Sequence, residues 1–245
     1  MKKLAFVFDL DGTIVPADTV FEFFGLYGKK ERAEKIYGLS CNAPKKLASE
    51  CGICIPAEKI YPGIDVEIVL GEIVEENGPI PLEKFEELAL TVPLCKGAPE
   101  FFAKLRERYG GNIFIVSSTF QPLGRAIAKR LGLDEENVLA TRLREEGGRV
   151  IGFLGPVMEA GEKEIALRNA AARRKLSLKD FVAVGDGSQD WYFMKAVADA
   201  GGLGIAVSAN RELVRKAGPK VVMEAPDFGK IWVEIEKFAC AKEVV

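Results

Sequence analysis

The chain has 245 residues, of which 48% are hydrophobic and 29% are charged, and its net charge is −2. A chain of this length can bury a sizeable core, either as one large domain or as a domain with a smaller insertion. The near-neutral charge offers no basic face for nucleic acid, no apolar run is long enough to cross a membrane, and the absence of histidine excludes Ser-His-Asp triads and imidazole metal ligands.

The first predicted element is a buried strand that ends in two acids. The stretch FVFDLDGT runs from three apolar residues into Asp9 and Asp11. Two lysines precede this apolar run, as in a signal peptide, but the run is short and meets acids, so we interpret it as the first strand of a mature cytoplasmic protein. Burying unpaired charge is costly, so two carboxylates at the end of a buried strand indicate a functional site.

Residues 16–93 interrupt the pattern with short helical stretches, many lysines and glutamates, and Pro-Gly breaks. We interpret this segment as a small, mostly helical cap domain inserted after the first strand, with residues 1–15 and 94–245 forming the catalytic core. Four cysteines fall in or beside the insertion, namely Cys41, Cys51, Cys54 and Cys95. They could bind a metal, form disulfides or remain free thiols; the second close cysteine pair of a usual four-cysteine zinc site is missing.

From residue 94 onward, helical and strand patterns alternate. Helical spacing of apolar residues predicts helices over 98–110, 121–132, 162–176 and 189–202, and continuous apolar runs predict buried strands over 112–118, 181–187 and 203–210. Residues 139–156 alternate polar and apolar residues around EEGGR, which predicts a β-hairpin. Strand–helix–strand units with short connections predict an α/β fold with a doubly wound parallel sheet covered by helices on both faces.

Polar side chains gather where three of these strands end. They are Asp9 and Asp11 after the first strand, Ser117, Ser118 and Thr119 after the second, and Asp186 and Asp190 after the third, with Lys163 at the start of the preceding helix. Ligands of doubly wound sheets bind outside the carboxyl ends of the strands. A carboxylate cluster suits Mg²⁺, and a lysine with hydroxyls suits phosphate oxygens. The pattern predicts Mg²⁺-assisted phosphoryl transfer, in which a carboxylate can act as the nucleophile.

Four motifs, in this order along the chain, resemble those of the haloacid dehalogenase superfamily of phosphatases. They are Asp-x-Asp-Gly-Thr at 9–13, the hydroxyl of Ser117, Lys163, and Gly-Asp-Gly-x-x-Asp at 185–190. The resemblance covers residues 1–15 and 94–245. The stretch VSSTF at 116–120 stands where the phosphoserine phosphatase-like branch has Val-Ser-Gly-Gly-Phe, and the predicted hairpin also matches that branch.

This resemblance implies the roles of the acids. Asp9 would be the nucleophile that attacks phosphorus. Asp11 would be the general acid that protonates the leaving alcohol and then the base that activates water. Mg²⁺ would be held by the side chains of Asp9 and Asp186 and by the backbone carbonyl of Asp11. Dehalogenases of the superfamily lack the second acid, so Asp11 argues against dehalogenation.

The resemblance also implies the phosphate site. Ser117 and Lys163 would hold the phosphoryl oxygens, with help from the backbone of Ser118. Asp190 would orient Lys163 or a metal-bound water. Thr13 and Gln189, the latter standing where the branch has asparagine, are expected to support these ligands from behind.

The substrate is less clearly indicated. The branch carries an acid nine residues after the nucleophile that reads the substrate ammonium, and Asp18 occupies that position, although it also suits the N-cap of a helix over 19–28. Arg32 comes too early to match the branch's carboxylate-binding arginine, and Lys45 or Lys46 would be imperfect substitutes. These departures weaken the case for phosphoserine but not for a small phosphomonoester.

The sequence leaves open the oligomeric state and two alternatives: a phosphomutase on the same scaffold and a non-catalytic phosphate-binding regulator.

Overall fold

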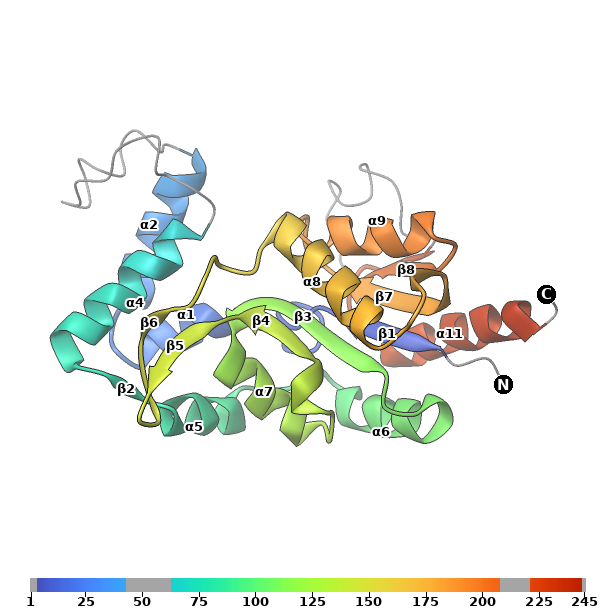
Figure 1. Ribbon diagram of the computed structural model, residues 1–245, viewed down its shortest axis with the longest axis horizontal. Coiled ribbons are helices and arrows are strands. Elements are labelled where there is room, and N and C mark those ends of the chain that lie inside the picture. Colours follow the sequence, from blue (N-terminus) through green and yellow to red (C-terminus); the bar gives the residue numbers. More distant parts are fainter. Residues whose placement is uncertain (1–3, 43–62, 208–220, 244–245) are drawn as a thin grey trace.

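The computed structural model describes residues 4–42, 63–207 and 221–243. Within these ranges the main layer is a six-stranded parallel sheet in the order β4-β3-β1-β7-β8-β9 (Figure 1). The strands are β1 (Ala5–Phe8), β3 (Ile113–Phe120), β4 (Val138–Thr141), β7 (Phe181–Gly185), β8 (Leu203–Ala206) and β9 (Val221–Val222). The predicted α/β fold with a doubly wound sheet is confirmed.

Helices cover both faces of this sheet. One face carries α8 (Ala160–Arg173) and α9 (Trp191–Asp199), and the other carries α6 (Ala98–Tyr109), α7 (Gln121–Arg130) and α11 (Phe228–Glu243) (Figure 1). Short 3₁₀ turns, η2 (Glu135–Asn137) and η3 (Leu178–Asp180), precede β4 and β7.

The central strand β1 shows why its stretch of the sequence consists of apolar residues without interruption. Its side chains alternate between the two faces: Phe6 and Phe8 belong to the core beneath α6, whereas Ala5 and Val7 belong to the core beneath α8 and α9. All four are fully buried. The ring of Phe8 meets that of Phe102 edge-on at 4.9 Å. A strand buried on both faces has no position for a polar side chain before it ends.

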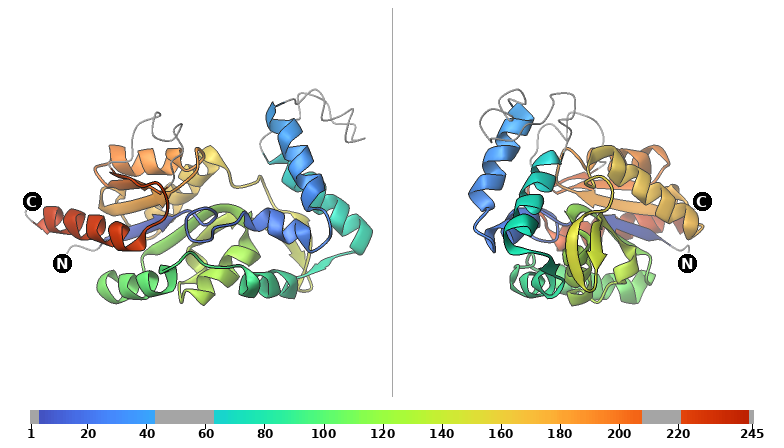
Figure 2. Two further views of the ribbon diagram at one scale, coloured as in Figure 1. Left: turned by 180° about the vertical axis from the view of Figure 1, so that it is seen from behind. Right: turned by 60° about the vertical axis from the view of Figure 1, so that its left-hand side comes forward.

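The insertion after β1 contains α1 (Thr19–Gly25), α2 (Lys30–Asn42), α4 (Ile64–Asn77) and α5 (Glu83–Thr91). Helices α2 and α4 lie side by side at one end of the sheet (Figures 1 and 2) and are joined by an ion pair of 2.6 Å between Arg32 and Glu72. Helix α5 instead packs on α7, where the guanidinium of Arg130 donates to the backbone carbonyl oxygens of Ala89 and Val92. Of the four inserted helices, α2 and α4 therefore form a projecting pair, whereas α5 joins the helix layer that contains α7.

A second, antiparallel sheet has the order β2-β6-β5, from β2 (Ile80–Pro81), β6 (Arg149–Phe153) and β5 (Leu143–Glu146). Strands β5 and β6 form the predicted hairpin, turning at two glycines, Gly147 and Gly148, with φ of 55° and 76°. Residues 139–141 were expected in this hairpin but belong to β4 of the parallel sheet. The prediction was wrong there because an edge strand is partly exposed and alternates as a hairpin does; Leu139 is half-buried between buried neighbours.

Several residues weighed in the sequence lie outside the described residues: Cys51, Cys54, Lys45 and Lys46. In the described part of the chain, Cys95 and Cys240 are free thiols. None of the helices described is both long enough and apolar enough to span a membrane.

Candidate active site

Three neighbouring strands end at one cavity. Because β1 lies between β3 and β7, the residues that follow these strands meet at the same edge of the sheet. The cavity has a volume of about 390 Å³. Its walls include nine of the residues selected from the sequence: Asp9, Asp11, Asp18, Ser117, Ser118, Lys163, Asp186, Gln189 and Asp190. Thr13 lies behind the wall, where its hydroxyl donates to Oδ1 of Asp186 at 3.5 Å.

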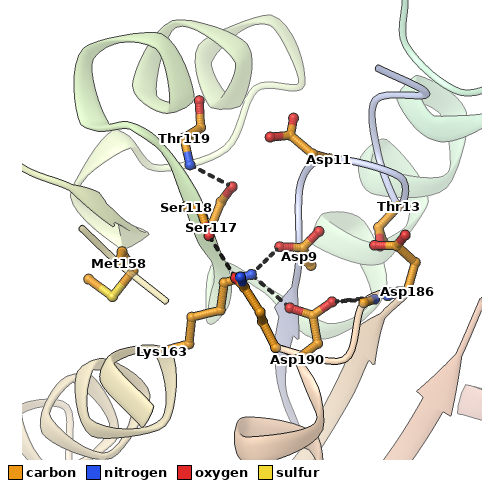
Figure 3. A network of polar contacts seen from close by, with 12 residues as sticks. Asp9, Asp11, Thr13, Ser117, Ser118, Thr119, Met158, Lys163, Asp186 and Asp190 are labelled. Atoms are coloured by element: carbon orange, nitrogen blue, oxygen red, sulfur yellow. Dashed lines mark hydrogen bonds and ion pairs between the residues drawn. The ribbon is translucent and has the colours of Figure 1, made fainter. Parts of the chain in front are cut away.

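A buried lysine joins two of these acids (Figure 3). Nζ of Lys163 donates to Oδ1 of Asp9 at 2.8 Å and to Oδ1 of Asp190 at 2.7 Å. The three residues are only 4%, 3% and 1% exposed, respectively. Burial alone would lower the pKa of the ammonium, but the carboxylates of Asp190 and Asp9 outweigh it and raise that pKa. Lys163 therefore stays charged and fixes the orientation of Asp9.

Asp190 also shapes the loop that follows β7. Its Oδ2 accepts hydrogen bonds from the backbone N–H groups of Asp186 at 3.1 Å and Gly187 at 2.9 Å. A Cβ on Gly185 would lie 2.7 Å from the Cβ of Asp190, so only glycine admits the aspartate there. Asp190 thereby ties Lys163 to the loop that carries Asp186.

Gly12 allows the first and third strand ends to approach each other. Its φ is +77°, and a Cβ at this position would lie 2.3 Å from Oδ2 of Asp186. The surrounding turn is closed by the N–H groups of Ile14 and Val15, which donate to the carbonyl oxygen of Leu10 at 2.8 and 2.9 Å. Glycine is required here both by the backbone conformation and by the carboxylate packed against it.

The acids at this edge form a set of oxygen donors. Carboxylate oxygens of Asp9, Asp186 and Asp190 all lie within 4.8 Å of one another. Burial, followed by the charge of Asp190, raises the pKa of Asp9 well above its ordinary value and that of Asp186 to about 6. Both oxygens of Asp190 already accept hydrogen bonds. Asp9 and Asp186 are therefore the carboxylates placed to hold a hard divalent cation such as Mg²⁺.

Asp11 has two unlike oxygens. Its Oδ2 accepts a hydrogen bond of 3.1 Å from the hydroxyl of Thr19, whereas its Oδ1 is buried and has no hydrogen-bond partner in the described structure. Burial, with a contribution from the charge of Asp18, raises the pKa of Asp11 to about 8. A carboxyl group with such a pKa can give up or take a proton near neutral pH.

Asp18 caps helix α1, since Oδ1 accepts hydrogen bonds from the N–H groups of Val20 at 3.0 Å and Phe21 at 3.1 Å. Asp18 also lines the cavity, so the same side chain caps the helix and contributes to the cavity wall. In the same cavity wall, Oγ of Ser118 donates to Oε1 of Gln189 at 3.2 Å and links the end of β3 to the loop after β7.

The cavity also contains residues that the sequence did not single out: Phe21, Tyr37, Asp65 and Glu159. Asp65 is 3% exposed, and burial raises its pKa. Burial, followed by the charge of Asp65, raises the pKa of Glu159 to about 7. Each acid stands beside the start of a helix, α4 or α8, where an acid in the sequence is typical of capping and indicates no site by itself.

The raised pKa values predict how the stability of the metal-free protein depends on pH. Asp186, Glu159 and Asp11 titrate at about 6, 7 and 8 when folded, above their ordinary values of 3.8 to 4.5, so the folded state binds more protons than the unfolded state. The stabilisation that comes from these raised pKa values is therefore full below the ordinary values of 3.8 to 4.5. It is lost as the pH rises from there to about 8. In EDTA, the melting temperature is expected to be higher at pH 6 than at pH 8.

The matched control is Asp186→Asn, which removes one of these groups and should flatten the dependence. A melting temperature that rises with pH in the wild-type protein would contradict the assignment. The pKa values of Glu72 and Asp227 are lowered. These two groups lose their stabilising effect only below their ordinary values of 4.5 and 3.8, so they do not change the stability between pH 6 and pH 8.

Comparison with known proteins places this arrangement in a family. Residues 6–195 match the model of the haloacid dehalogenase-like hydrolases. Phosphoserine phosphatase of Streptococcus thermophilus is 30% identical over 69% of this chain and 74% of its own length, and that of Methanocaldococcus jannaschii is 29% identical over 88% and 90%. That of Archaeoglobus fulgidus is 27% identical over 86% of this chain but only 54% of its own length.

Solved structures agree with the sequence matches. A phospho-aspartyl intermediate analogue of phosphoserine phosphatase superposes with a TM-score of 0.67 at 28% identity, covering 96% of this chain and 99% of that one. A substrate-bound phosphoserine phosphatase complex superposes with a TM-score of 0.68 at 27% identity, covering 96% and 99%. The chain belongs to the haloacid dehalogenase-like hydrolase family, in its phosphoserine phosphatase-like branch.

Proposed function

We propose that this protein is a Mg²⁺-dependent phosphatase that hydrolyses a small phosphomonoester through an aspartyl-phosphate on Asp9. The observation that carries the proposal is the buried contact of Lys163 with Asp9 and Asp190, in the same cavity wall as Asp186 and Ser117. The relatives named phosphoserine phosphatase support the reaction class. The neighbour solved as a phospho-aspartyl intermediate analogue supports the covalent intermediate.

The residues present fit a magnesium ion. The donors are oxygen atoms only, and the pKa values of Asp9 and Asp186 are raised by burial and then by neighbouring carboxylates, two costs that a bound cation would offset. Asp9, Asp186 and the backbone carbonyl of Asp11 would hold the ion. When bound, it supplies positive charge that offsets the repulsion between the carboxylates and the phosphate.

The proposed reaction has two steps. In the first, a carboxylate oxygen of Asp9 bonds to phosphorus, the bond from phosphorus to the leaving-group oxygen breaks, and Asp11 gives that oxygen its proton. In the second, Asp11 takes a proton from water, the water oxygen attacks phosphorus, and the bond to Asp9 breaks to release inorganic phosphate. Lys163 and Ser117 hold phosphoryl oxygens and so keep the phosphorus in line with Asp9.

The leaving group would lie toward the cap. Three carboxylates, those of Asp18, Asp65 and Glu159, line this cavity beside the aromatic rings of Phe21 and Tyr37. This wall favours a leaving group that carries an ammonium. Phosphoserine has such a group but adds a carboxylate, so it belongs in the substrate panel beside phosphoethanolamine and phosphocholine.

The test is release of inorganic phosphate from a panel of phosphomonoesters in Mg²⁺ and in EDTA. The panel contains phosphoserine, phosphoethanolamine, phosphocholine, phosphoglycolate and sugar phosphates. Metal-dependent release from at least one ester is expected, and EDTA should remove it. Absence of release from every ester by the folded protein would refute the proposal. A rearranged sugar phosphate without free phosphate would identify a phosphomutase instead.

A further inference from the structure

Two threonines that lie behind Asp11 have no role in the proposed reaction, although Thr119 belongs to the VSSTF stretch. Thr19 is the first residue of α1, and Thr119 lies near the end of β3, and both are fully buried. Their Oγ1 atoms are 2.6 Å apart, although the residues are separated by 100 positions in the chain. Oγ1 of Thr19 also donates to Oδ2 of Asp11 at 3.1 Å. Figure 3 shows Thr119 and Asp11 on neighbouring segments above Asp9.

The chemistry of the hydroxyl group gives this chain a direction. A threonine hydroxyl has one proton to donate. Since Thr19 donates its proton to the carboxylate of Asp11, the contact of 2.6 Å between the two threonines must use the proton of Thr119. Thr119 therefore donates to Thr19, and Thr19 donates to Asp11. A donor that is itself an acceptor in such a chain is a better donor, because the bonds polarise one another.

The two oxygens of Asp11 consequently have different roles. Oδ2 is held by the chain, whereas Oδ1 is buried and has no partner in the described residues. We propose that Thr119 and Thr19 position Asp11 so that Oδ1 is the atom that exchanges the proton with the leaving group. The inference rests on the proposed phosphatase reaction and on the role of Asp11 in it.

The proton transfer balances with this assignment. Before the transfer, Oδ1 carries the proton and Oδ2 accepts from Thr19. As the bond from phosphorus to the leaving-group oxygen breaks, the proton moves from Oδ1 to that oxygen, and the negative charge left on Asp11 is stabilised at Oδ2 by the hydroxyl of Thr19. The threonine protons stay on their own oxygens throughout. Both threonines are thus positioning residues.

Helix α1 holds the middle member of the chain in place. Asp18 caps this helix by accepting from the N–H groups of Val20 and Phe21, which fixes the backbone on either side of Thr19. Thr19 belongs to the segment inserted after β1, and Thr119 belongs to the main sheet. The orientation of the Asp11 side chain therefore depends on how α1 lies against β3.

The test compares two esters that differ in their need for a proton donor. Phosphoethanolamine has a poor leaving group that must be protonated, whereas p-nitrophenyl phosphate has a good one that leaves without a proton. Thr19→Val removes the hydroxyl with little change in shape. The comparison uses kcat/KM, which covers only the steps up to departure of the leaving group and excludes the later hydrolysis step that both esters share. The substitution is expected to lower kcat/KM for phosphoethanolamine by about 10- to 100-fold, a part of the whole effect of a general acid, and to lower kcat/KM for p-nitrophenyl phosphate less than threefold.

Conservative and matched variants separate positioning from packing. Thr19→Ser keeps the hydroxyl and should restore the wild-type ratio of the two rates. Thr119→Val leaves Thr19 bonded to Asp11 and should shift the ratio in the same direction by less. Thr141 provides the control: it is also fully buried, and its hydroxyl donates to the carbonyl oxygen of Ser118 at 2.7 Å and accepts from the N–H of Met158 at 3.0 Å. Thr141→Val should leave the ratio unchanged.

The outcomes are distinguishable. Equal losses on the two esters in Thr19→Val, or a ratio in Thr19→Ser as altered as in Thr19→Val, would overturn the inference while leaving the phosphatase proposal intact. If Thr19→Val does not fold, Thr119→Val and Thr19→Ser decide the question by the same ratio. Wild-type protein that hydrolyses neither of these esters nor any of the panel would refute the phosphatase proposal itself.

Discussion

Asp9→Asn is expected to abolish phosphate release and to leave the fold intact. Asparagine has the shape of aspartate, and its amide oxygen can still accept the hydrogen bond that Nζ of Lys163 makes to Asp9 at 2.8 Å. It cannot act as the attacking carboxylate. Loss of a covalent nucleophile should lower kcat by at least about 10³-fold. The measurement is phosphate release from the best ester of the panel at saturating Mg²⁺, with the melting temperature recorded beside it.

The control for this variant is Asp199→Asn, which changes an exposed acid in the last turn of α9. It should retain full activity. Asp9→Asn should melt within a few degrees of the wild-type protein, because it removes a buried negative charge while Lys163 keeps Asp190 as its ionic partner. A rate near that of the wild-type protein would remove Asp9 from the role of nucleophile.

Lys163→Met should have the largest effect on stability. The substitution removes the ammonium that lies between the buried carboxylates of Asp9 and Asp190 and leaves both without it. Removing one partner of a buried ion pair typically costs about 3–5 kcal/mol. For a chain of this size, that cost lowers the melting temperature by about 6–20 °C. Thermal unfolding in EDTA measures this effect, and loss of activity should accompany it.

The comparison for Lys163→Met is Lys195→Met on the surface of α9. Lys195 pairs with Asp199 at 2.5 Å, but both side chains are well exposed. Exposed pairs of this kind contribute about 0–1 kcal/mol. The destabilisation by Lys163→Met should also shrink as the pH is lowered, since the raised pKa of Asp9 lets that carboxyl become neutral without its partner. Equal melting temperatures for the two lysine variants would contradict the structural role given to Lys163.

The sequence predicts the parallel sheet and the residues of the cavity wall well, because both depend on local patterns. A strand buried on two faces has to be apolar until it ends, as in β1, and the first polar residue after it then marks the ligand-binding edge. The glycines have an equally local cause: Gly12 and Gly185 stand where a Cβ would collide with Asp186 and Asp190.

The remaining features depend on contacts between distant segments. Thr19 is an ordinary helix residue and Thr119 an ordinary strand residue until the fold brings their hydroxyl oxygens to 2.6 Å from each other. Acids at helix starts, such as Asp65 and Glu159, cannot be told from caps by position alone. The pKa of Glu159 is raised by burial and then by the charge of Asp65, which only the folded structure brings near it. Most of strand β4 was predicted as part of the hairpin and not of the parallel sheet, because an edge strand and a hairpin strand share the same alternating pattern.

The central place of β1 has a consequence for how the chain folds as it is synthesised. Phe6 pairs with Ile113 on one side and with Val182 on the other, 107 and 176 positions later in the chain. At a synthesis rate of about 5–20 residues per second, β7 emerges roughly 9–35 s after β1. Until β3 and β7 have both been made, β1 keeps at least one unpaired edge, and pairing over such separations is slow. The segment that carries Asp9 is therefore made well before either strand that flanks it, and it has to avoid wrong pairings until both have been synthesised.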